Sequence, residues 1–234
     1  NYMAEYEKWL NSDVLTAEEH AELLAIQDDP KEIESRFYGP LEFGTAGLRG
    51  ILDAGTARMN RLTVGKATQG LARVLLEDHD CPGVAIAYDS RHFSREFAEE
   101  AAGILAANGV RVWIYPELMP TPALSYAGRE LGCQSGIMIT ASHNPPEYNG
   151  FKVWAGQSTI HGEEIQKIKA IFEEGAFAEG TGTASRIDII PTYKQDILSR
   201  FKLARPVKVV LDGGNGAGGE ICADILIKLG ATVI

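Results

Sequence analysis

The residues best suited to carry out chemistry lie in the segment Thr140-Ala-Ser-His-Asn-Pro-Pro-Glu-Tyr-Asn-Gly-Phe-Lys152. It follows an apolar run at 135–139 and is rich in turn formers, so we expect a rigid loop at the carboxyl end of a strand, where α/β sheets bind ligands. Ser142 could act as a nucleophile or carry a phosphoryl group. His143 could hold an anionic oxygen or move a proton, and Lys152 could bring a cation back to the loop. The alternative is a hairpin-like loop whose Ser and Asn only satisfy turn hydrogen bonds.

Two further segments could bind an anion. Three glycines in Phe43-Gly-Thr-Ala-Gly-Leu-Arg-Gly50 permit close backbone approach, and Arg49 could bind a phosphate in a bidentate manner. Taken alone, that segment favours a tight turn with an exposed arginine. Asp89 and Arg91 follow the apolar run 84–88 and could bind a ligand. The favoured role for them is structural, in which they pair with each other or cap the next helix.

A glycine-rich loop at 213–219 matches GxGxxG at Gly214, Gly216 and Gly219. Such a loop can hold a pyrophosphate at a helix N-terminus, as in a nucleotide-binding oxidoreductase. The confirming acidic residue would fall roughly 20 positions further on, where the chain ends, so a tight strand-to-helix turn is favoured. Ser142 and His143 do not by themselves indicate a hydrolase triad, because neighbouring side chains tend to diverge and no buried carboxylate partner can be named.

The composition excludes several classes of protein. The 234 residues include 32 acidic and 22 basic side chains, for a net charge of −10, with 45% hydrophobic and 23% charged residues. Such a charge argues against a nucleic-acid-binding surface, although a local basic pocket could hold a small phosphorylated ligand. No apolar run approaches the roughly 20 residues of a membrane span and no signal-peptide pattern opens the chain, so we expect a cytoplasmic protein without a membrane partner. Three widely spaced cysteines without a CxxC pair indicate neither a disulfide framework nor a zinc site.

Short apolar runs that alternate with helical patterns must position these residues, and they predict an α/β layered fold with a largely parallel sheet. Strands are expected at 84–88, 110–115, 135–139, 151–154, 207–211 and 231–234. Helices are expected at 64–77, 94–108, 121–130, 162–174, 191–201 and 220–229. The stretch 175–186 is typical of a loop. In the acidic segment that precedes these elements, Thr16-Ala-Glu-Glu19 has the pattern of a capping box.

The expected units are a helical extension at 1–40, a first domain at 41–199 and the start of a second domain at 200–234. This last unit is too short to bury a core of its own. We therefore expect the chain to be an N-terminal fragment of something longer.

The order of these motifs resembles one known family. Thr140-Ala-Ser-His-Asn-Pro145, with its continuation Tyr148-Asn-Gly-Phe-Lys152, resembles the phosphoserine loop of the α-D-phosphohexomutases, the phosphoglucomutase/phosphomannomutase superfamily. Residues 43–50 resemble the start of that family's first domain, Asp89-Ser-Arg91 its next signature, and Val209-Val-Leu-Asp212 the opening of its second domain. The likeness covers about residues 40–234. The extension before it is similar to the longer branch with phosphoglucomutase-2-like and phosphopentomutase-like enzymes.

The resemblance implies a three-layer α/β/α domain with a mixed, largely parallel sheet, followed by the start of a second similar domain. It also implies an isomerase that works through a phosphoenzyme. Ser142 would give its phosphoryl group to a sugar monophosphate, and the bisphosphate would reorient and return the other one. Arg49, His143, Asn144 and Lys152 would bind phosphate or substrate, with Lys152 as the proton shuttle. Mg²⁺ would be bound partly through the phosphate on Ser142, and a lysine base would need a pKa lowered by neighbouring cations.

The chain also departs from the family pattern. The Asp-x-Asp-x-Asp-Arg metal loop is absent from it, as are the sugar-recognition and phosphate-binding loops of the third and fourth domains. We therefore expect this chain alone to be inactive as a mutase, which a coupled assay with glucose 1-phosphate would test. Glucose phosphate is the favoured substrate, with mannose phosphate or a pentose phosphate as alternatives. A non-catalytic phosphosugar-binding relative is the alternative from another class, and the oligomeric state stays open.

Overall fold

The computed structural model describes residues 1–44, 47–155, 158–159, 167 and 183–234. The helix expected at 162–174 lies outside the described residues except for Lys167, and so does most of the loop expected at 175–186. Within the described part of the chain, no helix is both long and apolar enough to span a lipid bilayer.

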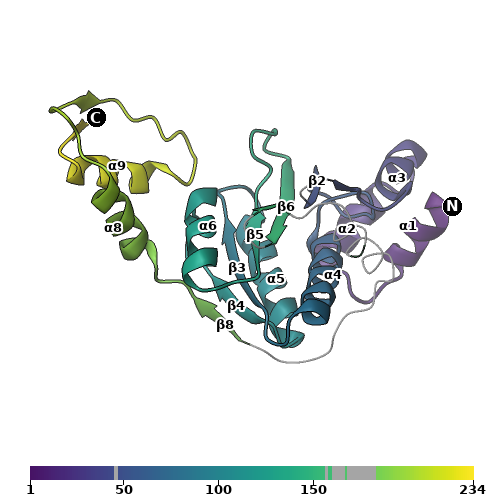
Figure 1. The fold of residues 1–234 in the computed structure, drawn as a ribbon. Helices are drawn as coiled ribbons and strands as arrows, with labels where there is room; N and C mark the ends of the chain where they lie inside the picture. The colour runs from purple at the N-terminus through teal and green to yellow at the C-terminus, as the bar shows by residue number, and fades with distance from the viewer. Residues whose placement is uncertain (45–46, 156–157, 160–166, 168–182) are drawn as a thin grey trace.

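A mixed eight-stranded sheet forms the centre of the molecule, with strand order β1-β2-β6-β5-β3-β4-β8 and β7 paired to β6 (Figure 1). The strands are β1 (Phe43–Gly44), β2 (Gly47–Ile51), β3 (Gly83–Tyr88), β4 (Arg111–Ile114), β5 (Ser135–Ile139), β6 (Tyr148–Ala155), β7 (Ser158–Thr159) and β8 (Ala184–Arg186). Strands β5, β3, β4 and β8 run parallel, whereas β1, β2, β6 and β7 pair antiparallel. The parallel strands therefore end together at one edge.

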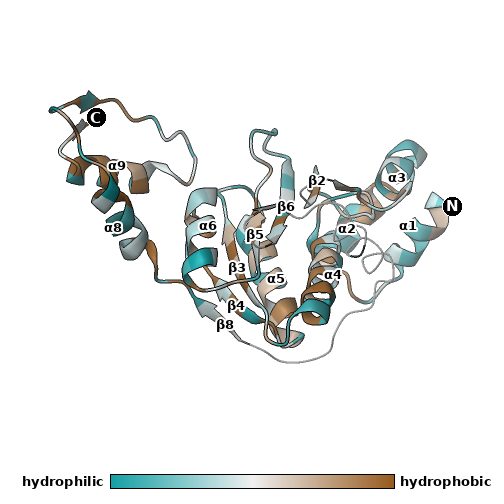
Figure 2. Ribbon diagram, viewed as in Figure 1, coloured by the Kyte–Doolittle hydropathy of each residue, from teal (hydrophilic) through white to brown (hydrophobic). Residues whose placement is uncertain are grey.

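Helices cover both faces of this sheet and create two apolar cores. Helices α4 (Arg61–Asp78) and α5 (Ser94–Ala107) pack against one face, where Leu71, Phe97 and Ile137 are buried. Helix α6 (Thr121–Glu130) packs against the other face, over a smaller core. Figure 2 shows apolar colour in the central strands and on parts of the covering helices, and β3 and β5 are buried at every residue, as expected of strands covered on both faces. The expected α/β class and three-layer arrangement are confirmed.

Four strands were missed by the sequence patterns, namely β1, β2, β7 and β8, and two of them, β2 and β8, have a clear physical reason. Strand β2 was expected to be a tight turn because of its glycines, but Gly47 is there because a Cβ would lie 1.8 Å from the carbonyl oxygen of Phe151 on β6. Strand β8 falls in the stretch expected to be a loop. Among the described strands it pairs with β4 only, and it is largely exposed, so its sequence needs no alternation of apolar residues.

Three short helices at the N-terminus form a small core of their own beside α4 (Figure 1). They are α1 (Tyr2–Leu10), α2 (Ala17–Ala25) and α3 (Pro30–Phe37). The predicted capping box is present, because the Thr16 hydroxyl accepts from the Glu19 amide and the Glu19 carboxylate accepts from the Thr16 amide. Ile33 and Phe37 of this core are buried together with Ala54, which follows β2.

The C-terminal residues form a small unit beyond the main sheet. Helix α8 (Ile190–Arg200) leads to strands β9 (Lys208–Val209) and β10 (Thr232–Val233), which pair in parallel around helix α9 (Gly219–Lys228). These two strands are shorter than expected. Ile221, Ile225 and Ala231 are buried here, whereas Val210 is 80% exposed. The core of this unit is therefore far smaller than that of the main sheet.

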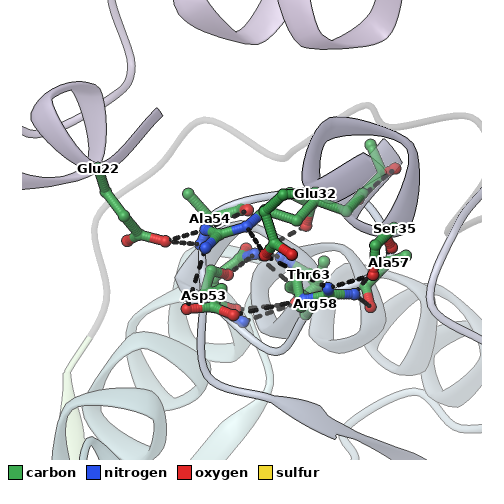
Figure 3. Close-up of polar contacts among 12 residues, drawn as sticks. Glu22, Glu32, Ser35, Asp53, Ala54, Ala57, Arg58 and Thr63 are labelled. Atoms are coloured by element: carbon green, nitrogen blue, oxygen red, sulfur yellow. Dashed lines mark hydrogen bonds and ion pairs between the residues drawn. The ribbon is translucent and has the colours of Figure 1, made fainter. Parts of the chain in front are cut away.

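A cluster of charged side chains attaches the N-terminal helices to the segment after β2 (Figure 3). Arg36 of α3 is buried and pairs with Glu22 of α2, Glu32 of α3 and Asp53. Arg58 donates to the Ser35 carbonyl oxygen at 2.8 Å, and its Nε lies 3.4 Å from the Asp53 carboxylate. These contacts join elements that lie far apart in the sequence.

Replacing Arg36 should destabilise the protein, because the three carboxylates would keep their desolvation cost and lose their cation. We expect Arg36→Ala to lower the free energy of unfolding by about 3 kcal/mol in a urea titration. The matched control is Arg200→Ala. Arg200 pairs with Asp196 on the exposed surface of α8, and its loss should cost less than about 1 kcal/mol. Equal losses in the two variants would contradict this prediction.

Candidate active site

Ser142 stands on the loop at the carboxyl end of β5 and is exposed to solvent. Its φ angle is +58°, a left-handed conformation that L-residues other than glycine adopt at a cost of about 1–3 kcal/mol. Its hydroxyl lies 3.3 Å from Nδ1 of His143. We expected these adjacent side chains to diverge. The left-handed turn at Ser142 instead brings them together, so that expectation is wrong.

Arg91 holds the far side of this loop. Its Nη1 donates to the carbonyl oxygens of Pro145 at 2.8 Å and Tyr148 at 3.0 Å. Its Nη2 donates to the carbonyl oxygens of Ser142 at 2.9 Å and Asn144 at 2.6 Å. The guanidinium therefore contacts both ends of the loop that carries Ser142.

Asp89 links Arg91 to the base of the same loop. One carboxylate oxygen accepts from the Arg91 amide at 3.0 Å and the Ser94 hydroxyl at 2.7 Å. The other lies 3.6 Å from Nε of Arg91 and accepts from the Thr140 hydroxyl at 2.6 Å. The Thr140 hydroxyl in turn accepts from the Ser142 amide at 3.0 Å. The expected pairing of Asp89 with Arg91 is observed, but it also positions the serine loop.

Arg49 reaches the serine loop from β2. Its Nη1 donates to Oδ1 of Asn144 at 2.9 Å, and it lies opposite Gly150 of β6. A Cβ on Gly150 would lie 2.5 Å from the Thr140 carbonyl oxygen, so only glycine permits this close approach of the β6 backbone to the loop. The glycines that looked like turn formers thus bring β2, β6 and the loop together.

Lys152 lies on β6, between Met138 of β5 and Gly47 of β2. Because Arg49 pairs with Gly150 and side chains alternate along a strand, Arg49 and Lys152 share one face of the sheet. Burial lowers the pKa of the Lys152 amine, the nearby Arg49 guanidinium lowers it further, and Asp89 opposes both effects. The lowered pKa that a lysine base requires therefore has a physical cause here.

An open cavity of about 400 Å³ lies in front of the serine hydroxyl. It is lined by Asp89, Ser90, Arg91, His92, Ser142, Asn144, Pro146, Asn215 and Gly216. The last two belong to the glycine-rich loop before α9, where Gly214 has a φ of +52° and donates its amide to Asp212. This loop is the tight strand-to-helix turn that was favoured. The Ser90 hydroxyl donates to the Asn215 carbonyl oxygen at 2.6 Å, so the turn forms one wall of the cavity.

The structure brings most of the predicted site residues together. Ser142 contacts His143, and Arg49 contacts Asn144 two residues beyond the serine. Lys152 is joined to this group only through the strand register and its electrostatic coupling to Arg49. The contribution of Arg91 to the loop was missed, although its place beside Asp89 was a signal. Local sequence patterns could not predict its contacts, because Arg91 and the carbonyls that it binds lie more than 50 residues apart in the sequence.

The side chains also limit where a metal ion could bind. Over the described residues, no three His, Cys, Asp or Glu side chains gather into a group that could hold a metal ion. Ser142 itself offers a single oxygen. The described residues alone therefore do not fit a complete magnesium site.

The α/β/α domain presents an exposed serine at the carboxyl end of a central strand, and Arg49 contacts the loop that carries this serine. The chain belongs to the phosphoglucomutase/phosphomannomutase family. Residues 40–179 match the family model described as phosphoglucomutase/phosphomannomutase, alpha/beta/alpha domain I. The members of this family are isomerases.

Individual relatives agree with this assignment. The chain is 38% identical over 153 residues to a phosphomannomutase/phosphoglucomutase of Pseudomonas aeruginosa, covering 65% of this chain and 33% of the relative. It is 39% identical over 171 residues to a phosphoglucomutase of Staphylococcus aureus, covering 72% and 30%. Among solved structures, a family protein of Burkholderia thailandensis superimposes with a TM-score of 0.69 at 29% identity, covering 82% of this chain and 43% of that one. The chain thus spans about a third of the length of these curated relatives.

The coupling between Arg49 and Lys152 can be measured directly. Arg49→Gln removes a positive neighbour, so the pKa of Lys152 should rise toward its ordinary value while burial still keeps it low. The measurement is an NMR titration of the lysine side-chain carbons. Arg111→Gln is the control, because Arg111 lies on β4, three strands away from β6 in the sheet. An unchanged pKa in Arg49→Gln would contradict the coupling.

Proposed function

We propose that this chain is the phosphoserine-bearing part of a phosphohexose mutase that interconverts glucose 1-phosphate and glucose 6-phosphate. The observation that supports this most is the exposed Ser142 hydroxyl, presented on a fixed left-handed turn with Arg49 bound to the same loop. Membership of the phosphoglucomutase/phosphomannomutase family adds independent support. A hydroxyl in this setting suits a group that accepts and returns a phosphoryl group.

The proposed reaction has two transfers. In the first, the bond between phosphorus and Oγ of Ser142 breaks and a bond to the free hydroxyl oxygen of the hexose monophosphate forms, while that hydroxyl loses its proton to a base and Oγ of Ser142 takes up a proton. The hexose bisphosphate then reorients in the site. In the second transfer the other phosphoryl group moves to Oγ of Ser142, whose hydroxyl loses its proton, and the sugar oxygen that is left regains a proton. Phosphoryl transfer of this kind needs mainly positioning and neutralisation of charge.

The neighbouring side chains are assigned roles by their chemistry. Lys152 is the proposed proton shuttle, since its lowered pKa increases the fraction of neutral amine near neutral pH. Arg49 is proposed to neutralise phosphate charge, with Asn144 holding its guanidinium. His143 would hold phosphate oxygen beside Ser142, and its ring nitrogen already lies within reach of the hydroxyl.

Mg²⁺ is proposed as the cofactor of the whole protein. It would neutralise charge on the transferring phosphoryl group, and Ser142 would contribute an oxygen of its phosphate. The described residues supply no further group of metal ligands, so no step of the mechanism is derived through the ion.

The proposed substrate is a hexose phosphate, and the names of the relatives rank the candidate sugars. Glucose phosphate comes first, because phosphoglucomutase stands in the names of both curated relatives described above, and mannose phosphate follows because phosphomannomutase stands in one of them. A pentose phosphate is a further alternative. The proposal is tested by adding each sugar monophosphate to the phosphorylated protein and measuring loss of the phosphoryl group.

Substitution of Ser142 tests the proposal at its central atom. The full-length protein should gain the mass of one phosphoryl group on the peptide that contains Ser142, and a hexose monophosphate should remove it. We expect Ser142→Ala to abolish both this mass and mutase turnover. Ser90→Ala is the matched control, since Ser90 lines the same cavity and should leave the phosphopeptide in place.

Each other outcome has a definite meaning. Full turnover by Ser142→Ala would reject the phosphoserine mechanism. A protein that binds hexose phosphate with no phosphopeptide and no turnover would instead be the non-catalytic relative.

A further inference from the structure

We propose that Arg91 is a positioning residue for phosphoryl transfer, which acts on Ser142 through the loop backbone without touching the substrate. This inference rests on the proposed function, because it concerns the rate at which Ser142 is phosphorylated. It goes further by assigning a role in the reaction to Arg91, which lines the same cavity but has no assigned role in the proposed function.

The donor count of Arg91 supports an indirect role. Each terminal nitrogen of a guanidinium carries two N–H groups. Nη1 donates to two loop carbonyls and Nη2 to two others, so all four terminal N–H groups are used within the protein. The remaining Nε lies 3.6 Å from the Asp89 carboxylate. Arg91 therefore keeps no terminal donor for a phosphate.

The contacts also fix both polar groups of the Ser142 backbone. Its carbonyl oxygen accepts from Arg91, and its amide donates to the Thr140 hydroxyl, which is held by Asp89. Holding both sides of a residue opposes its return from the left-handed region, where φ is +58°. Without these contacts the backbone at Ser142 could relax out of the left-handed region, and the hydroxyl would then change direction.

The side chains that make these contacts are largely covered, since Arg91 and Asp89 are 14% and 17% exposed. The hydrogen bonds of Arg91 to Tyr148 and Asn144 are partly buried, whereas those to Pro145 and Ser142 face solvent, so the geometry of all four bonds together holds the loop. A lysine at position 91 would keep the charge but offers three donors on one nitrogen, without the planar fork that reaches four carbonyls. Arg91→Lys therefore removes the geometry of the contact and retains its charge.

The experiment measures transfer of a labelled phosphoryl group from a hexose 1,6-bisphosphate to Ser142 in the full-length protein. The bond from phosphorus to a sugar oxygen breaks, the bond to Oγ forms, and the serine proton ends on the sugar hydroxyl. We expect Arg91→Lys to lower the saturating rate about 100-fold, the size of effect that a displacement of about 1 Å produces, with an unchanged half-saturating concentration. Arg186→Lys is the control, because Arg186 lies on the exposed edge strand β8 and pairs with Glu99 of α5.

A second measurement detects the loop itself. Amide hydrogen exchange of the peptide 140–148 should become faster in Arg91→Lys, while exchange in α4 and the thermal midpoint stay at the wild-type values. If Arg91→Lys fails to fold, Thr140→Val takes its place, because it removes the acceptor for the Ser142 amide with little change of volume. The same loss of rate is then expected.

The outcomes separate this inference from the proposed function. Absence of labelling in the wild-type protein overturns the proposed function, and the role of Arg91 falls with it. Labelling of the wild type together with wild-type rates in Arg91→Lys and Thr140→Val overturns the role of Arg91 alone. A raised half-saturating concentration with an unchanged saturating rate would also overturn it, since it would place Arg91 in contact with the substrate.

Discussion

The polar connection between Asp89, Arg91 and the serine loop is the constraint on which the rest of the site depends. The backbone of Ser142 is strained by its positive φ angle, and hydrogen bonds from neighbouring residues must offset that strain. They do so because β3 and β5 are adjacent parallel strands, which places residue 89 beside residue 140 at the same edge of the sheet. The order of strands thus creates the site, because parallel strands bring their carboxyl ends together.

The antiparallel part of the sheet supplies the positive charge. Strand β6 returns from the serine loop and pairs with both β5 and β2, so Lys152 and Arg49 come to one face close to the loop. Burial is the main cause of the lowered pKa of Lys152, and the like charge of Arg49 lowers it further, so the proximity of the two cations is unfavourable in itself. The protein thus keeps a local positive field within a chain of net charge −10, and the short range of electrostatic interactions in salt makes that possible.

Sequence patterns predicted what depends on local periodicity and chain order. Helices α4, α5 and α6 and strands β3 and β5 were expected close to their observed bounds, because each shows a strong apolar pattern. The serine loop was expected for its turn formers. Strand β2 was not, since Gly47 and Gly50 are selected by contacts with Phe151 and Leu41 that no local pattern encodes. Likewise, the partners of Arg91 are backbone carbonyls, which any sequence in the loop would offer.

The small N-terminal core has a consequence for where the catalytic fold can be cut. Ala54 is buried among Ile33 and Phe37, and it belongs to the segment that continues directly from the strand carrying Arg49. Residues before position 40 are therefore structural partners of the segment that follows β2, although none of them lines the cavity at Ser142. A shortened version that begins at the family domain would expose the apolar surface around Ala54 to water. Arg49 would then be held less firmly, although the deleted residues do not touch it.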